Sequence, residues 1–216
     1  MNLTIVRIGD MTTQDTKENI LMVSLELFSQ RGFSAVSIRD ICKKVNIKES
    51  SIYYHFQDKR AILAELLRRF QNTATTMMGQ LESMLNDTSG SHNIGSHDII
   101  GNYFFEQYLM DDFCNKVIRL LLIEQFNNEE AQIIYDHWIF AKPLAFQSRV
   151  FSALMEMKII KHADSYYLAE KYYAPIFLFA QRWLFCGPLT DEHKQSFRAS
   201  VYQHIQRFFE EIAEEN

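Results

Sequence analysis

Residues 37–60 read SIRDICKKVNIKESSIYYHFQDKR, and this stretch decides the fold. Ser37 stands three positions before Asp40, which is the capping-box pattern that begins a helix. An apolar face follows at helical spacing, formed by Ile38, Ile41 and Val45. Asn46 is the residue best suited to the left-handed backbone that a tight turn between helices requires. We therefore expect a short helix from Ser37 to Val45 and a second helix directly after it.

The second short helix is expected over Glu49 to His55, with Ile52 and Phe56 facing inward. Its other face carries short polar and aromatic side chains: Ser50, Ser51, Tyr53, Tyr54 and His55. A helix that reads base edges in the major groove needs such side chains forward, a cation nearby for phosphate and a bracing helix. The four residues YYHF alone are more typical of a packed aromatic patch. The whole stretch predicts a helix-turn-helix.

Residues 13–70 resemble the N-terminal domain of the tetracycline-repressor (TetR/AcrR) family of bacterial regulators. The matching elements are the end of the first helix at Phe28 to Phe33, the SIRDI opening at Ser37, and SIYYHF at Ser51 followed by Asp58 and Lys59. In combination these elements are highly specific. The resemblance implies an all-α chain with an N-terminal three-helix DNA-binding domain and a larger C-terminal helical domain for ligand binding and dimerisation.

The resemblance also assigns roles to single residues. It implies that Tyr54 and Lys59 contact phosphates and that Tyr53 lies near the backbone or a thymine methyl group. It also implies that Glu49, Ser50 and Ser51 point towards base edges and that Arg39 contacts a guanine or a phosphate. Ser37 braces the recognition helix from the helix before it, and His55 helps to hold the end of that helix.

Two residues depart from the family pattern. Asn46 stands where the family usually has glycine, which the turn tolerates. Lys48 stands where a Ser or Thr often caps the recognition helix, and losing that cap costs on the order of 1 kcal/mol. Lys48 contributes a phosphate contact instead, although a cation is unfavourable at a helix N-terminus.

Helical periodicity extends over the rest of the chain. We expect a first helix from Thr13 to a C-terminal cap at Gly32 and a long helix after Asp58 that runs through Leu85. A loop is expected at 86–97, and further helices at 98–110, 112–126, 128–158, 165–185 and 191–213, with kinks at Pro143 and Pro175. The expected domains are an N-terminal arm at 1–12, the helix-turn-helix domain at 13–60 and the ligand-binding and dimerisation domain at 61–216. Because Met11 precedes the family-like region, residues 1–10 are either a disordered arm or not part of the native protein.

The charge is unevenly distributed along the 216 residues. Residues 1–70 carry a net charge of +3 and the remainder −8, within a total of −5. A basic N-terminal third suits a polyanionic partner such as DNA. The three cysteines, Cys42, Cys114 and Cys186, show neither disulfide nor metal spacing, so we expect no metal and no cofactor. No apolar stretch reaches the length of a membrane span or a secretory signal, so we expect a cytoplasmic protein without a membrane partner.

The rear of the chain is rich in aromatic residues, most of which are expected in the core. An apolar cavity there would admit an apolar or amphipathic small molecule, and its candidate lining residues are Tyr103, Gln107, His137, Trp138 and Tyr172. The last two helices carry more apolar surface than one hairpin hides. Pairing with a second copy of the chain would bury this surface, which is formed by Tyr173, Ile176, Phe177, Ala180 and Leu184 on one side and by Val201, Ile205, Phe208 and Ile212 on the other.

The sequence therefore predicts a DNA-binding repressor. As a homodimer paired through its last two helices it would bind a palindromic double-stranded operator with half-sites about 34 Å apart, and a small-molecule inducer would release it. The alternative is a DNA-binding regulator controlled by a protein partner or a corepressor. An enzyme is the remaining class, but His92, His97 and Asp98, or Asp136 with His137, lack the spacing of a known mechanism, so we expect no catalysis.

Overall fold

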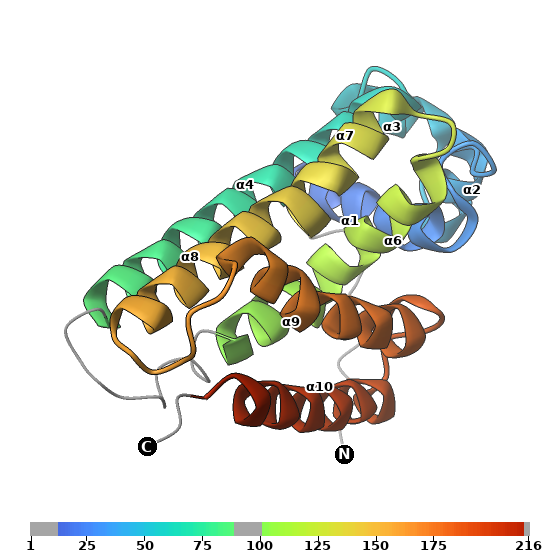
Figure 1. Ribbon diagram of the computed structural model, residues 1–216. Coiled ribbons are helices and arrows are strands. Elements are labelled where there is room, and N and C mark those ends of the chain that lie inside the picture. The colour runs from blue at the N-terminus through green and yellow to red at the C-terminus, as the bar shows by residue number, and fades with distance from the viewer. Residues whose placement is uncertain (1–12, 89–100, 214–216) are drawn as a thin grey trace, which may run out of the picture. The chain divides into compact units, whose positions relative to one another are not determined.

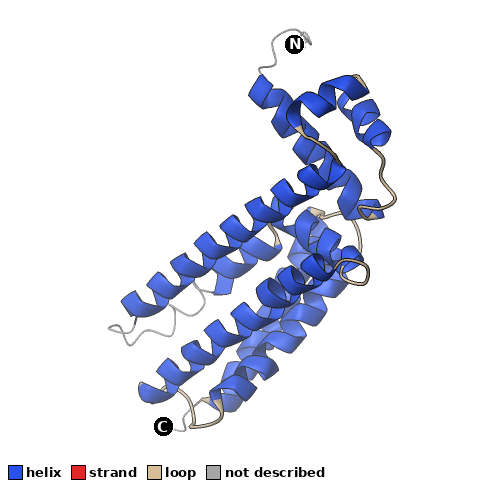
Figure 2. Cartoon of the chain, turned by 90° about the horizontal axis from the view of Figure 1, so that it is seen from above, coloured by secondary structure: helices blue, strands red, loops and turns tan. Residues whose placement is uncertain are grey.

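The computed structural model describes residues 13–88 and 101–213, and these residues are helical almost throughout (Figures 1 and 2). The elements are α1 (Thr13–Arg31), α2 (Ile38–Val45), α3 (Glu49–His55), α4 (Lys59–Thr88), η1 (Phe105–Leu109), α6 (Asp112–Glu124), α7 (Glu129–Tyr135), η2 (Asp136–Ala141), α8 (Lys142–Glu156), α9 (Ser165–Ala180), η3 (Gln181–Phe185) and α10 (Asp191–Ile212). Within the described ranges the β-type pairing is a single antiparallel bridge between Ile160 and Ala213. The predicted all-α class is confirmed.

The chain divides into two compact units, of which the first ends at Arg69 and the second begins at Phe70. The first unit holds α1, α2, α3 and the start of α4. Helix α4 continues past the division to Thr88, two residues beyond the predicted start of the loop. The N-terminal arm and residues 89–97 of the predicted loop lie outside the described residues.

The local sequence signals of the first unit are confirmed. Ser37 caps α2 in a reciprocal capping box with Asp40. Asn46 takes the left-handed conformation at φ 63° and ends α2. Gly32, at φ 80°, ends α1, and its N–H donates to the carbonyl of Phe28 (2.8 Å). The ring of Phe33 then packs edge-on against that of Phe28, with the centroids 5.4 Å apart. These turns fix the directions in which α2 and α3 leave α1.

In the second unit, the segment expected as one helix over 128–158 contains the wider π-helical turn η2, which ends two residues before Pro143. A proline nitrogen cannot donate a hydrogen bond, so the carbonyl four residues earlier needs another partner. That carbonyl belongs to Ile139 and accepts from the buried Tyr173 hydroxyl at 2.8 Å. The neighbouring carbonyl of Trp138 accepts from the buried Tyr108 hydroxyl at 3.2 Å. Burial raises the pKa of both tyrosines, so both hydroxyls stay protonated and able to donate.

Replacing Tyr173 by phenylalanine should lower the free energy of unfolding by about 1 to 3 kcal/mol, because it leaves the buried Ile139 carbonyl without its donor. Urea unfolding of the purified protein measures the loss. Tyr167→Phe is the matched control, since Tyr167 lies exposed on the same helix. Equal stability of the Tyr173→Phe variant and the wild type would show that the hydroxyl does not support the π-helical turn.

A buried amide joins two other π-helical turns of the second unit. Asn115 on α6 is fully buried, and its Nδ2 donates to the carbonyls of Leu109 at the end of η1 (3.1 Å) and of Leu184 in η3 (3.2 Å). Widened turns leave carbonyls without the usual helical donor, and Asn115 supplies that donor to both. The two segments are thereby held to the same side chain.

The predicted partner-facing surface of α9 and α10 is wrong for most of its residues. Tyr173, Ile176, Ala180, Leu184, Val201, Phe208 and Ile212 are all buried within the single chain. Phe177 and Ile205 are half-buried, and the ring of Phe177 packs against Phe140 at 5.0 Å between centroids. Helices α9 and α10 pack this apolar face against α8 and the segment that contains η1. Phe151 contacts Tyr172, for example, and Phe105 contacts Phe197. The exposed apolar residues of these helices are others, chiefly Leu178 and Tyr202.

Candidate nucleic-acid interface

Helix α3 presents a polar and aromatic face to solvent. Ile52 is fully buried and Phe56, the residue after the helix, is also buried, so these two fix the helix to the first unit. On the other side Glu49 and Ser50 are exposed, Tyr53 is 55% exposed and Tyr54 is 80% exposed. Large aromatic side chains are usually covered in a folded protein, so two such exposed tyrosines on one short helix indicate a binding surface. The sequence predicted this division of the helix.

The beginning of α3 lacks a side-chain cap. Lys48 occupies the N-cap position with an extended backbone and makes no capping hydrogen bond. Its side chain is exposed. The predicted loss of the cap at this position is confirmed, and the cation lies at the edge of the exposed face of α3.

Helix α2 contributes Arg39 to the same region. The Arg39 Nε lies 3.2 Å from Glu49 Oε1, and both side chains are well exposed. Ser37, by contrast, is engaged in the capping box, because its hydroxyl donates to Asp40 Oδ2 (2.6 Å) and accepts from the Asp40 N–H (3.2 Å). The Ser37 hydroxyl also holds the pKa of Asp40 below its usual range. Ser37 therefore positions α2 through the capping box.

Lys59 holds the loop between α1 and α2. Its Nζ donates to the carbonyls of Phe33 (2.7 Å) and Val36 (2.6 Å) and lies 4.1 Å from the centroid of the Phe33 ring. The side chain is half-buried. The sequence predicted a phosphate contact for this residue, whereas the structure shows an ammonium group that ties the start of α4 to that loop. His55, also half-buried, packs edge-on against Tyr54 at the end of α3.

Ion pairs also fasten α1 to α4 within the first unit. Arg69 Nη1 donates to both carboxylate oxygens of Glu18, at 2.8 and 2.7 Å, and Arg69 Nε donates to Glu65 (2.9 Å). Arg68 also donates twice to Glu65, and these hydrogen bonds lower the pKa of Glu65 to about 2. The Glu65 carboxylate thus remains ionised at neutral pH, and the cluster keeps α1 and α4 in register.

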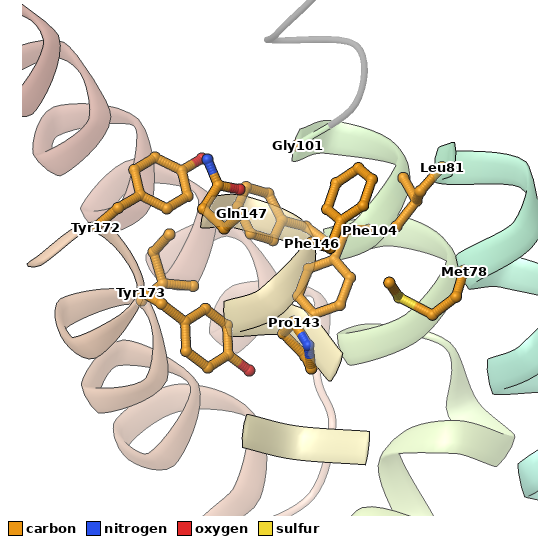
Figure 3. A pocket seen from close by; sticks show the side chains of 11 residues that line it. Met78, Leu81, Gly101, Phe104, Pro143, Phe146, Gln147, Tyr172 and Tyr173 are labelled. Carbon is orange, nitrogen blue, oxygen red and sulfur yellow. The ribbon is translucent and has the colours of Figure 1, made fainter. Parts of the chain in front are cut away.

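The five candidate ligand residues do not surround one cavity. Tyr172 lines a small cavity of about 40 Å³ in the second unit, together with Phe104, Phe146, Gln147 and Tyr173 (Figure 3). Tyr103 and Gln107 line a separate shallow hollow beside α4. His137 is exposed and Trp138 is buried without lining any of the described cavities. The three described cavities do not bring these five residues together, and their contact with a ligand stays a prediction.

Most of the residues that line the cavities were not predicted from the sequence. The small cavity adjoins a larger hollow of about 610 Å³, and the two share Gly101, Phe105, Gln147 and Tyr172. Gln147 is the one amide that lines the small cavity, and it lies four residues after Pro143. A polar residue within an apolar helical face was therefore the available signal in the sequence. Across the described ranges no cluster of three or more metal-binding side chains occurs, and no helix is long and apolar enough to cross a membrane.

The chain is similar to known proteins in both sequence and fold. Residues 20–66 match the family described as bacterial regulatory proteins, tetR family. The biofilm operon icaADBC HTH-type negative transcriptional regulator IcaR of Staphylococcus aureus is 23% identical over 201 residues, which cover 89% of this chain and 98% of IcaR.

Solved structures extend the likeness along the chain. A TetR-family regulator from Mesorhizobium loti covers 95% of this chain and 100% of its own, with a TM-score of 0.64 and 17% identity. A transcriptional regulator from Saccharomonospora viridis, solved in complex with choline, covers 94% and 100%, with a TM-score of 0.63 and 16% identity.

A short α2, a tight turn at Asn46 and an exposed α3 define a helix-turn-helix protein of the DNA-binding transcriptional regulators. Residues 20–66 thus match the family of bacterial regulatory proteins described as the tetR family, and the fold of the whole chain is similar to that of solved regulators of this kind.

Proposed function

We propose that the protein is a homodimeric repressor that binds a palindromic operator through α3 and is released by a small molecule. The observation that carries the proposal is the exposed face of α3, where two tyrosines lie free of the core beside Arg39 and Lys48. In a helix-turn-helix dimer two such helices enter successive major grooves, about 34 Å apart. Binding of purified protein to DNA fragments over a salt series tests it, since phosphate contacts make affinity fall steeply with salt.

Each exposed side chain has a proposed role in that complex. Tyr54 and Lys48 contact phosphates, Tyr53 contacts the backbone or a thymine methyl group, and Ser50 and Ser51 lie towards base edges. The support is the exposure of Lys48, Ser50, Tyr53 and Tyr54 at the start and on one face of α3, while Ser51 is half-buried between Ser50 and the buried Ile52. Ser37, His55 and Lys59 act as positioning residues, since each contacts its own unit.

The dimer surface of the proposal is the outer side of α9 and α10. Ala174, Leu178 and Arg182 form an exposed stripe at four-residue spacing, and Ala199 and Tyr202, which also line the larger hollow, are exposed on α10. Small residues beside large apolar ones allow two helices to approach and pack. A two-fold axis through this surface would pair it with the same surface of a second copy.

Leu178→Glu should convert the dimer to a monomer, because a carboxylate would be buried against the apolar surface of the partner. We expect the dissociation constant, measured by sedimentation, to rise about 30-fold or more. Ile133→Glu is the matched control: Ile133 on α7 is 61% exposed and Leu178 is 62% exposed. Loss of the dimer in the control, or an unchanged dimer with Leu178→Glu, would place the interface elsewhere.

The inducer site of the proposal is the larger hollow of the second unit. Its 610 Å³ suits a drug-sized molecule, whereas the adjoining 40 Å³ cavity holds little more than one water. The hollow is lined by Phe105, Val150, Ile205 and Phe209, with the Glu106–Arg198 ion pair among its polar groups. An apolar or amphipathic molecule fits this lining, and the choline complex of the Saccharomonospora viridis regulator shows a small molecule held by a similar fold.

Gly101→Leu should block the inducer. A Cβ at Gly101 meets the Tyr172 hydroxyl at 3.6 Å and the Phe105 ring at 3.7 Å, so the backbone accepts it while the rest of the leucine fills the boundary of the hollow. Among apolar and amphipathic compounds that release wild-type protein from DNA, we expect this variant to require about tenfold more compound. Gly79→Leu is the control, because a Cβ there meets nothing within 4 Å. If no compound releases the wild type, or if both variants respond alike, the inducer site is wrong.

A further inference from the structure

Arg39 and Glu49 come from different helices and meet on the exposed surface of the first unit. Arg39 lies in the first turn of α2 and Glu49 in the first turn of α3, and their Nε and Oε1 atoms are 3.2 Å apart. The two side chains are 86% and 51% exposed. An exposed pair of this kind contributes little to stability, so its placement beside the tyrosines of α3 points to a role in recognition.

The ion pair leaves the outer edges of both groups available. Arg39 uses Nε towards Glu49, so its two terminal nitrogens, Nη1 and Nη2, project as a fork of donors. The nearest acid along the chain, Asp40, is engaged with the backbone N–H and hydroxyl of Ser37 and does not compete for the guanidinium. Glu49 keeps its second carboxylate oxygen, which can only accept. Side by side, the pair presents two donors followed by an acceptor.

One base pair shows the complementary pattern in the major groove. A G·C pair presents the acceptors N7 and O6 of guanine and then the N4 amino donor of cytosine. The guanidinium fork fits N7 and O6, and the carboxylate fits the amino group. An A·T pair presents an acceptor, a donor and an acceptor, so it would set the fork against an amino group and the carboxylate against the O4 of thymine.

We propose that Arg39 and Glu49 act as one unit that reads a single G·C base pair in each half-site, with Arg39 on the guanine and Glu49 on its paired cytosine. The inference rests on the proposed DNA-binding function and adds a base preference to it. The carboxylate has two effects: it holds the guanidinium in the plane of the base pair, and it rejects bases that present an acceptor at its own position.

Selection of preferred sites from random DNA by the full-length protein tests the proposal. The base preference at every position is compared for wild type, Glu49→Gln, Arg39→Lys and the double variant. An amide both donates and accepts, so Glu49→Gln should relax discrimination at one G·C position of each half-site about tenfold. Arg39→Lys should relax the same position, and the double variant should be no worse than either single variant, because the two groups act together.

Glu130→Gln is the control, since it removes the same charge from an exposed position on α7 in the other unit. Its base preferences should match the wild type. Three results would overturn the paired reading and leave the DNA-binding function intact. They are effects of the Arg39 and Glu49 variants at different base positions, additive losses in the double variant, and a uniform gain in affinity with Glu49→Gln. If the wild type enriches no sequence, the proposed function itself fails, and the inference fails with it.

Discussion

Replacing Tyr53 and Tyr54 together by alanine should lower the affinity for operator DNA at least about 100-fold, with no loss of thermal stability. The two side chains are largely exposed, so little packing is lost on truncation. In the complex each tyrosine would offer a hydroxyl to phosphate and a ring to the groove, and a dimer would lose every contact twice. A hydrogen bond to a charged group contributes about 1.5 to 3 kcal/mol, so a loss of this size is conservative. Fluorescence anisotropy with a selected DNA fragment measures it.

The chain provides a matched control for this variant. Tyr166 and Tyr167 are also adjacent, lie in the first turn of α9 and are 48% and 59% exposed. The Tyr166→Ala and Tyr167→Ala double variant should bind DNA as the wild type does. Equal losses in the two double variants, or none in either, would remove the exposed face of α3 from DNA recognition.

Lys59→Met should destabilise the first unit and weaken DNA binding as a consequence. The change deletes an ammonium group that donates to the carbonyls of Phe33 and Val36 and lies over the Phe33 ring. Losing charge-assisted hydrogen bonds and leaving two carbonyls without this donor should cost about 2 to 3 kcal/mol in the free energy of unfolding. Urea unfolding measures that cost, and Arg60→Met is the control because Arg60 is exposed beside it on α4.

The salt dependence of binding separates the two roles considered for Lys59. A residue that only positions the loop changes affinity without changing the slope of log affinity against log salt concentration. A phosphate contact would lower that slope by about one for each chain. A reduced slope with unchanged stability would therefore support the phosphate contact predicted from the sequence, and an unchanged slope with lower stability would support the structural role.

The local architecture of the first unit was predictable from the sequence because its signals are local. Ser37 and Asp40 are three residues apart, and Asn46 is one of few residue types that adopt positive φ, so the boundaries of α2 follow from near neighbours. The division of α3 into a buried and an exposed face likewise follows from the spacing of Ile52 and Phe56.

The second unit was less predictable because its features depend on distant contacts. Helical spacing identified Tyr173 and Ile176 as apolar, but it does not tell whether an apolar face is covered by the same chain or by a second copy. The π-helical turn η2 depends on hydroxyls supplied by Tyr108 and Tyr173, which lie about thirty residues away on either side. The role of Lys59 is similar, since its two acceptors lie on the loop before α2.

The central claim is tested most directly by selecting genomic DNA fragments with the purified wild-type protein. The same selection is then repeated with the Tyr53→Ala and Tyr54→Ala double variant. The proposed function predicts enrichment of a palindrome whose half-sites are about one helical turn, or a multiple of it, apart. It also predicts that this enrichment is lost in the double variant. Enrichment of the same palindrome by the double variant, or of no sequence by the wild type, would contradict the account.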